Sequence, residues 1–141
     1  MRPSRPSEKT VLALDTNVLV QILIDDPQAI DQCAAARALA SAAGEVYVPQ
    51  VVQIETVWVL ESAYGFARAE LAAVLETLLG NQSFVLQHAD VLRTALGEFR
   101  NGAADFSDYV ILTQARAENM TLATFDRKLG KLPGAQLVSG K

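Results

Sequence analysis

Five acidic residues occupy positions in the chain where a carboxylate could carry chemistry: Asp15, Glu55, Asp105, Asp108 and Asp126. Asp15 and Asp126 each follow a short apolar run, so both are expected at the ends of strands, and the strand before Asp15 is expected to be buried. Glu55 has apolar residues three and four positions away on both sides, which places it on the hydrophobic face of a helix. Asp105 and Asp108 are three apart and share one face at the start of another helix. An unpaired carboxylate in such surroundings needs a partner.

Metal-assisted hydrolysis is the chemistry that these acids predict. Open α/β sheets bind ligands at the carboxyl ends of their strands, so we expect Asp15, Glu55, Asp108 and Asp126 to converge there. Two bare carboxylates about 4 Å apart repel by about 4 kcal/mol at an effective dielectric of about 20, so the cluster needs shared protons or a cation. Ligation by oxygen alone suits Mg²⁺ or Mn²⁺. Such an ion activates water and polarises a phosphate, which is the chemistry of phosphodiester hydrolysis.

Four of the five acids also have a purely structural interpretation. Glu55 could reach the edge of its helix face and extend to water. Asp105 is a natural N-cap, and Asp108 at the third helical position is favoured by the helix dipole. Asp126 suits a turn or a cap. The metal site therefore rests on all the acids together.

Other kinds of site lack their residues. Cys33 is the only cysteine and reads as a small buried side chain, so a disulfide, a CxxC zinc site and a redox pair are excluded. His88 is the only histidine, and GxSxG, GxGxxG and GxxxxGK[ST] are absent, which removes His-rich zinc sites, serine hydrolases and Gly-rich phosphate loops. The net charge of −4 does not suggest a general nucleic-acid binder.

The periodicity predicts one α/β domain over residues 10–141, preceded by a flexible tail over residues 1–9. A length of 141 residues with 50% hydrophobic residues suits one domain with a substantial core. No apolar run is long enough to span a membrane and no signal peptide is evident, so we expect a cytoplasmic protein. We predict strands over 11–14, 46–48, 83–86 and 121–124, a possible fifth over 136–138, and helices over 18–24, 28–43, 49–64, 68–79, 90–99 and 106–118. Strands that alternate with helices indicate a central parallel sheet of four or five strands in a three-layer α/β/α arrangement.

The sequence resembles PIN-domain ribonucleases, and in particular the VapC-like toxins of type II toxin–antitoxin pairs. The resemblance runs from Val11 to Val138, and the segments that carry it are Leu14-Asp15-Thr16-Asn17, Ile54-Glu55, Ala104-Asp105-Phe106-Ser107-Asp108 and Thr124-Phe125-Asp126. Each segment is short, but their order and the eighteen residues from Asp108 to Asp126 are specific together.

The resemblance implies residue roles and partners. It makes Asp15, Glu55, Asp108 and Asp126 the catalytic quartet that holds one or two Mg²⁺ or Mn²⁺ ions, with Asp105 as a further candidate ligand. Asn17 and Thr124 match polar positions that support the acids. The implied activity is cleavage of single-stranded or loop RNA by a homodimer that a cognate VapB-like antitoxin inhibits. Tyr109 departs from the pattern, because small residues are common at this position.

Basic residues are concentrated in the last quarter of the chain. Arg116, Arg127 and Lys128 are candidates for contacts with RNA phosphates, although an ordinary solvated surface is the alternative. The RNA itself is not identified by the sequence.

Two further functions remain open. A phosphatase of the haloacid-dehalogenase type would use Asp15 as a covalent nucleophile, but it requires a second acid where Asn17 stands. A PIN-like module that binds RNA or a partner without catalysis is the other alternative.

Overall fold

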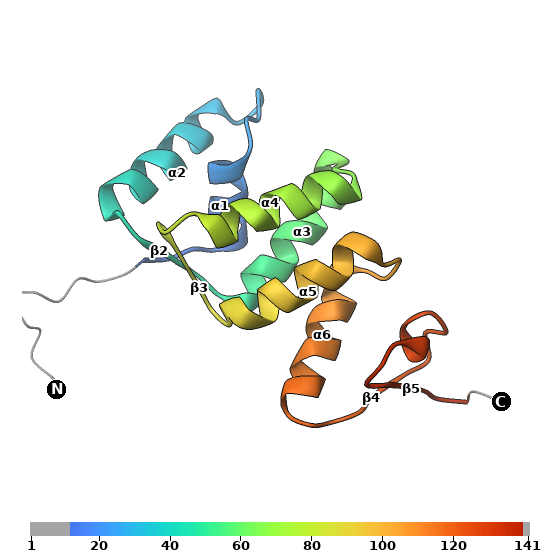
Figure 1. Ribbon diagram of the computed structural model, residues 1–141. Coiled ribbons are helices and arrows are strands. Elements are labelled where there is room, and N and C mark those ends of the chain that lie inside the picture. The colour runs from blue at the N-terminus through green and yellow to red at the C-terminus, as the bar shows by residue number, and fades with distance from the viewer. Residues whose placement is uncertain (1–11, 140–141) are drawn as a thin grey trace, which may run out of the picture.

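The computed structural model describes residues 12–139 (Figure 1). The tail expected over residues 1–9, and Val11 at the start of the first expected strand, lie outside the described residues. The elements in chain order are β1 (Leu12–Ala13), α1 (Thr16–Leu23), α2 (Ile30–Ala43), β2 (Val46–Val48), α3 (Gln50–Tyr64), α4 (Arg68–Gly80), β3 (Phe84–Leu86), α5 (Ala89–Asn101), α6 (Phe106–Ala117), β4 (Leu122–Thr124), the short 3-10 helix η1 (Leu129–Lys131) and β5 (Ala135–Leu137).

The predicted α/β class with parallel strands is confirmed. β2 lies between β1 and β3, and all three run parallel, with Leu12 opposite Val46 and Val46 opposite Phe84. Each connection between these strands contains two helices, as parallel pairing requires. The core is formed around β2 by α1, α3, α4 and α5, and its fully buried side chains include Leu19, Val48, Leu60, Leu75 and Leu92.

The five strands are divided between two sheets. β4 pairs with β5 in a separate parallel sheet, in which Leu122 lies opposite Ala135. Figure 1 shows this pair beyond α6, away from the sheet formed by β1, β2 and β3. Within residues 12–139, β1 and β4 therefore each have one edge without a neighbouring strand.

This arrangement corrects the expectation that the first strand is buried. Leu12 and Ala13 are exposed, whereas Leu14, which follows them, is buried. The physical reason is that β1 is an edge strand with a partner on one side only. An apolar run shows that a strand can be covered, but it does not show what covers it.

Local signals at helix ends decide most of the boundaries, but α1 begins two residues before its predicted start and α2 begins two residues after it. Gly65 has a left-handed backbone (φ 69°) that ends α3, as expected of glycine. The sequence predicted that the second helix begins just after Pro27, but α2 begins at Ile30. The carboxylate of Asp26 accepts the N–H of Gln28, which forms a turn before the helix instead of capping it.

The helices are too short or too polar to cross a bilayer. In the part of the chain that the structure describes, no helix has the length and apolar character of a membrane span.

Candidate functional site

Asp15 and Glu55 lie close together because Thr16 connects them. Asp15 is the N-cap of α1, and its Oδ1 accepts the backbone N–H of Thr16 at 2.7 Å. The hydroxyl of Thr16 donates to Glu55 Oε1 at 2.8 Å, which joins the start of α1 to the middle of α3. Thr16 is buried, whereas both acids are exposed. The side chains of Asp15, Thr16 and Glu55 thus form one polar group.

The side chain of Glu55 is exposed and does not face the hydrophobic core. It reaches the edge of its helix face and extends to water, as the structural interpretation stated. Its neighbours Val51 and Trp58 are themselves 60% and 66% exposed. Val52, by contrast, is 5% exposed, and Val59 packs partly against the core, so Glu55 lies at the edge of the apolar face of α3. The spacing of apolar residues alone does not report how far such a face is covered.

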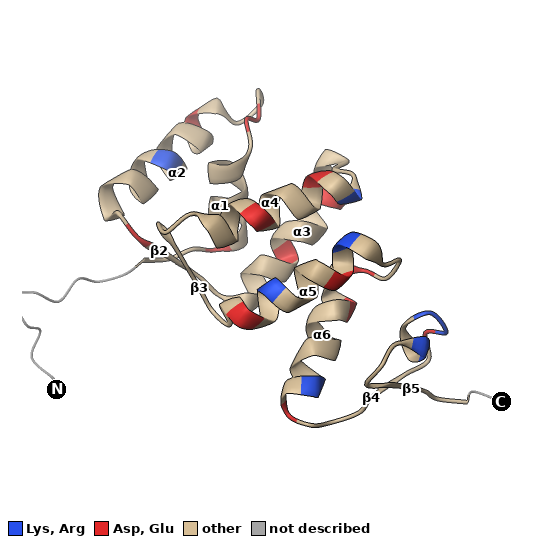
Figure 2. Cartoon of the chain, viewed as in Figure 1, with Lys and Arg blue, Asp and Glu red and all other residues tan. Residues whose placement is uncertain are grey.

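The other three acids line one cleft. Asp105, Asp108 and Asp126 surround a space of about 380 Å³, together with Ala103, Ala104, Arg127 and Lys128. Figure 2 shows basic residues on the segment between β4 and β5, which carries Arg127 and Lys128. The cleft therefore has acids from two segments and a basic rim.

The backbone around these acids shows which structural roles they also take. Asp105 is at the N-cap position of α6, but its carboxylate makes no capping hydrogen bond with the described residues, which leaves it to the cleft. Asp126 takes the turn role that the sequence allowed, because its Oδ1 accepts the N–H groups of Lys128 at 2.8 Å and Leu129 at 3.1 Å. The Thr124 hydroxyl in turn accepts the N–H of Asp126 at 3.0 Å.

Asp108 is the acid most affected by its surroundings. Burial raises the pKa of the Asp108 carboxyl above its ordinary value, and the nearby charges of Asp105 and Asp126 raise it further. A hydrogen bond from the backbone of Asp105 offsets part of the rise. A cation in the cleft would relieve this repulsion, so the site favours a positively charged ligand.

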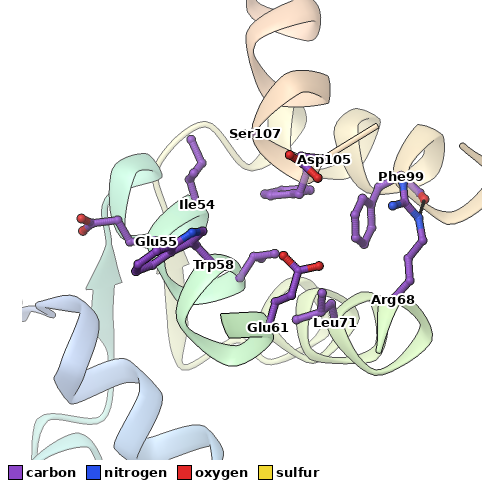
Figure 3. A pocket seen from close by; sticks show the side chains of 11 residues that line it. Ile54, Glu55, Trp58, Glu61, Arg68, Leu71, Phe99, Asp105 and Ser107 are labelled. Atoms are coloured by element: carbon purple, nitrogen blue, oxygen red, sulfur yellow. Dashed lines mark hydrogen bonds between the residues drawn. The ribbon is translucent and has the colours of Figure 1, made fainter. Parts of the chain in front are cut away.

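The two groups of acids remain apart. Glu55 and Asp105 both line a pocket of about 280 Å³ between α3, α4 and the start of α6. Figure 3 shows them on opposite sides of it, with Ile54 and Trp58 nearer to Glu55. Among residues 12–139, no three Asp, Glu, His or Cys side chains are close enough together to hold a metal ion. The predicted convergence of Asp15, Glu55, Asp108 and Asp126 is therefore only partial in this structure.

Two other predicted site residues, Asn17 and Arg116, line neither the acidic cleft nor the pocket beside it. Asn17 lines a groove between α1 and α2 with Gln21 and Gln32, and none of the five acids lines this groove. Arg116 forms a structural contact, since its Nη1 lies 3.0 Å from both carboxylate oxygens of Glu98 and its Nε donates to the Pro133 carbonyl at 2.8 Å. Arg116 is thus held by contacts within the protein, whereas Arg127 and Lys128 line the acidic cleft.

Comparison with known proteins identifies the family. The family model described as "PIN domain" matches residues 12–135, which is most of the chain. The chain belongs to the PIN domain family. It is also 28% identical over 123 residues to a VapC ribonuclease of Aquifex aeolicus (strain VF5), a match that covers 84% of this chain and 90% of that protein. The resemblance drawn from the motifs to a VapC-like PIN protein is thereby confirmed.

The donor set of this PIN domain suits a hard divalent cation. Every candidate ligand is a carboxylate, which Mg²⁺ and Mn²⁺ prefer. Asp105, Asp108 and Asp126 line one cleft, and the charges of Asp105 and Asp126 add to the rise in the Asp108 pKa that burial mainly causes. Asp105, Asp108 and Asp126 therefore fit as one part of a metal site, and Asp15 and Glu55 would have to approach them to complete it.

Thr16 and Arg68 are site residues that the sequence analysis missed. Thr16 is adjacent to Asp15 in the first motif, and that adjacency was the available signal. Arg68 lines the pocket shared by Glu55 and Asp105. No pattern in the sequence singles out Arg68, because its contacts are with backbone atoms far along the chain.

Proposed function

We propose that this PIN domain is a metal-dependent endoribonuclease that hydrolyses phosphodiester bonds in single-stranded or loop RNA. The observation that carries the proposal is the cleft that Asp105, Asp108 and Asp126 line together with Arg127 and Lys128. Carboxylates that hold a cation and basic groups that hold phosphates are what hydrolysis of a polyanion requires. The similarity to a VapC ribonuclease supports the same reaction class.

The proposed roles follow from where the residues lie. Asp15, Glu55, Asp108 and Asp126 would hold one or two Mg²⁺ or Mn²⁺ ions, with Asp105 as a further ligand. When bound, the ion supplies an activated water and a polarised phosphate. Thr16 orients Glu55 through its hydroxyl, and Thr124 fixes the backbone of Asp126. Arg127 and Lys128, which line the same cleft, would contact phosphates of the RNA.

The proposal requires Asp15 and Glu55 to approach the acids of the cleft. Pairing between the free edges of β1 and β4 would bring them closer. Leu14 donates its N–H to Tyr47 of β2, so the backbone groups of Ala13 point to the opposite edge of β1. Leu122 donates its N–H to Gly134 beside β5, so Ala123 likewise presents its backbone groups at the free edge of β4. Unpaired strand edges of this kind favour pairing. Because each strand leads into one of the acids, pairing of β1 with β4 would bring Asp15 toward Asp126.

We also propose that the protein acts as the toxin of a toxin–antitoxin pair, in which a VapB-like antitoxin inhibits a homodimer. The support is the similarity to VapC together with apolar side chains that the described part of the chain leaves uncovered, such as Val51, Trp58 and Phe125. Co-expression with the neighbouring reading frame tests this part. A small protein that co-purifies and blocks cleavage is expected, and a monomer that is active alone in the cell without toxicity would contradict it.

Cleavage of a labelled single-stranded RNA by the purified protein tests the enzymatic proposal. We expect cleavage with Mg²⁺ or Mn²⁺, none after addition of EDTA, and none by a folded Asp15→Asn variant. If no RNA is cut at micromolar protein with Mn²⁺, the non-catalytic RNA- or partner-binding alternative is correct. The match to the PIN family over residues 12–135 favours the nuclease over a covalent-phosphate phosphatase.

A further inference from the structure

The connection between α5 and α6 is tied down by a single arginine from another helix. Arg68, the first residue of α4, donates from Nε to the Phe99 carbonyl and from Nη2 to the Ala104 carbonyl, each at 2.7 Å. Its guanidinium carbon lies 3.9 Å from the centre of the Phe99 ring. Figure 3 shows Arg68 beside Phe99 at the edge of the pocket that Asp105 also lines. One side chain thus fixes the backbone before and after the connection.

Tyr109 holds the same connection from inside the protein. Its ring is 3% exposed, and its hydroxyl accepts the N–H of Ala104 at 3.3 Å. A Cβ atom at Gly102 would overlap this hydroxyl and lie 2.7 Å from the ring atom Cζ, so only glycine leaves room for the tyrosine. Ala104 is therefore held by its N–H and by its carbonyl. The next residue is Asp105.

These contacts determine where the acids of α6 stand. Asp105 is the N-cap of α6, and its carbonyl accepts the N–H of Asp108 at 3.0 Å. A shift of the Ala104 peptide would therefore move both carboxylates relative to Asp126. The planar fork of an arginine holds two carbonyls at once, which the single ammonium of a lysine does not reproduce.

We infer that Arg68 is a positioning residue for Asp105 and Asp108, assisted by Tyr109. Arg68 acts through the backbone of residues 99–104 and not on the substrate. The inference rests on the proposed function in so far as these two acids bind the metal ion. Arg68 would thus not touch the metal ion but would hold the backbone that carries its ligands. Loss of such a supporting group typically weakens metal binding by about 10- to 100-fold.

The chain offers a matched control in Arg37. Arg37 donates from Nε to the Ile22 carbonyl at 3.1 Å and from Nη2 to the Ile24 carbonyl at 2.7 Å, so it is also an arginine that holds two backbone carbonyls. It belongs to α2 and contacts the end of α1, and it lines neither the acidic cleft nor the pocket beside it. Arg68→Met and Arg37→Met therefore both lose a backbone clamp, but only the first should affect the site.

Mn²⁺ affinity, measured by calorimetry and by the Mn²⁺ concentration that gives half-maximal RNA cleavage, is the readout. We expect both variants to lose thermal stability, while Arg68→Met alone weakens Mn²⁺ binding by about tenfold and regains most of its rate at high Mn²⁺. Tyr109→Phe should weaken binding in the same direction. Arg68→Lys, which keeps the charge, serves if Arg68→Met does not fold, and it should show the same loss of affinity.

Other results would overturn the inference. Unchanged Mn²⁺ affinity in a folded Arg68 variant would leave Arg68 only a stabilising role. A raised KM for RNA at unchanged Mn²⁺ affinity would make it a substrate contact instead. If the wild type binds Mn²⁺ and the Arg68 variant binds it more weakly, but neither cuts RNA, the inference holds and the proposed function fails. If the wild type neither binds Mn²⁺ nor cuts RNA, both fail.

Discussion

Replacing Thr16 with valine removes one hydroxyl from the candidate site and leaves the shape of the side chain nearly unchanged. The hydroxyl donates to Glu55 Oε1 at 2.8 Å, and Thr16 is buried, so the valine methyl occupies space that is already enclosed. The backbone N–H that Asp15 accepts is retained. The variant therefore tests the contact between Thr16 and Glu55 and little else.

The expected loss of stability is small. A hydrogen bond to a charged group contributes about 1.5–3 kcal/mol, but Glu55 is exposed and water replaces part of the contact. We therefore expect Thr16→Val to lower the free energy of unfolding by about 1 kcal/mol, which corresponds to a fall in Tm of about 4 °C.

We also expect Thr16→Val to slow RNA cleavage. If this hydrogen bond orients Glu55, misplacement that costs the transition state about 1.4 kcal/mol slows RNA cleavage about tenfold. Cleavage of a labelled single-stranded RNA at saturating Mn²⁺, together with thermal unfolding, gives both quantities. Thr16→Ser keeps the hydroxyl and should retain most of the rate. The reasoning is refuted if Thr16→Val and Thr16→Ser cleave equally fast, because Glu55 would then not depend on the hydroxyl.

Three further predictions concern the cleft and the strand edges. Folding raises the pKa of Asp108 above its ordinary value of 3.8, so the charged carboxylate destabilises the fold once the pH rises above that value. Asp108→Asn should therefore raise Tm at pH 7 in EDTA. A gain in Tm that persists below pH 3.8 would contradict this cause. Gly102→Ala should lower stability by about 1–3 kcal/mol in denaturant unfolding, because its methyl overlaps a buried tyrosine hydroxyl, whereas Gly97→Ala, with open space around it, should be neutral or stabilising. Mg²⁺ with a non-cleavable RNA should slow amide hydrogen exchange at Ala13 and Ala123 if β1 pairs with β4, and unchanged exchange at both would rule out that closure.

The fold was predictable from the sequence because its signals are local. Strands and helices alternate with clear periodicity, and glycine at position 65 ends a helix as expected. The start of α2 was wrong because Asp26 and Pro27 form a turn as readily as a helix cap. The division of the strands between two sheets was not predictable, since strand pairing depends on contacts between distant segments that periodicity does not report.

The candidate site was predictable as a set of residue types more than as an arrangement. The spacing of Asp105 and Asp108 placed them at one helix start, and the cleft with Asp126 agrees with that expectation. Glu55 was expected on a hydrophobic face but lies at its edge, because Val51 and Trp58 beside it are exposed while Val52 is buried. Thr16 and Arg68 were missed because their importance lies in which distant atoms they contact.

Asp15 and Glu55, together with the acids of the cleft, are proposed to bind a divalent cation that RNA cleavage requires. The most direct test is cleavage of a single-stranded RNA over a Mn²⁺ titration by the wild type and by Asp108→Asn, with circular dichroism to confirm that both are folded. We expect cleavage that rises with Mn²⁺ and disappears in EDTA, and a rate in the variant that is lower by at least about a hundredfold, since losing a group that only supports a ligand already costs about 10- to 100-fold. Equal cleavage by the two proteins, or cleavage that persists in EDTA, would contradict this proposal.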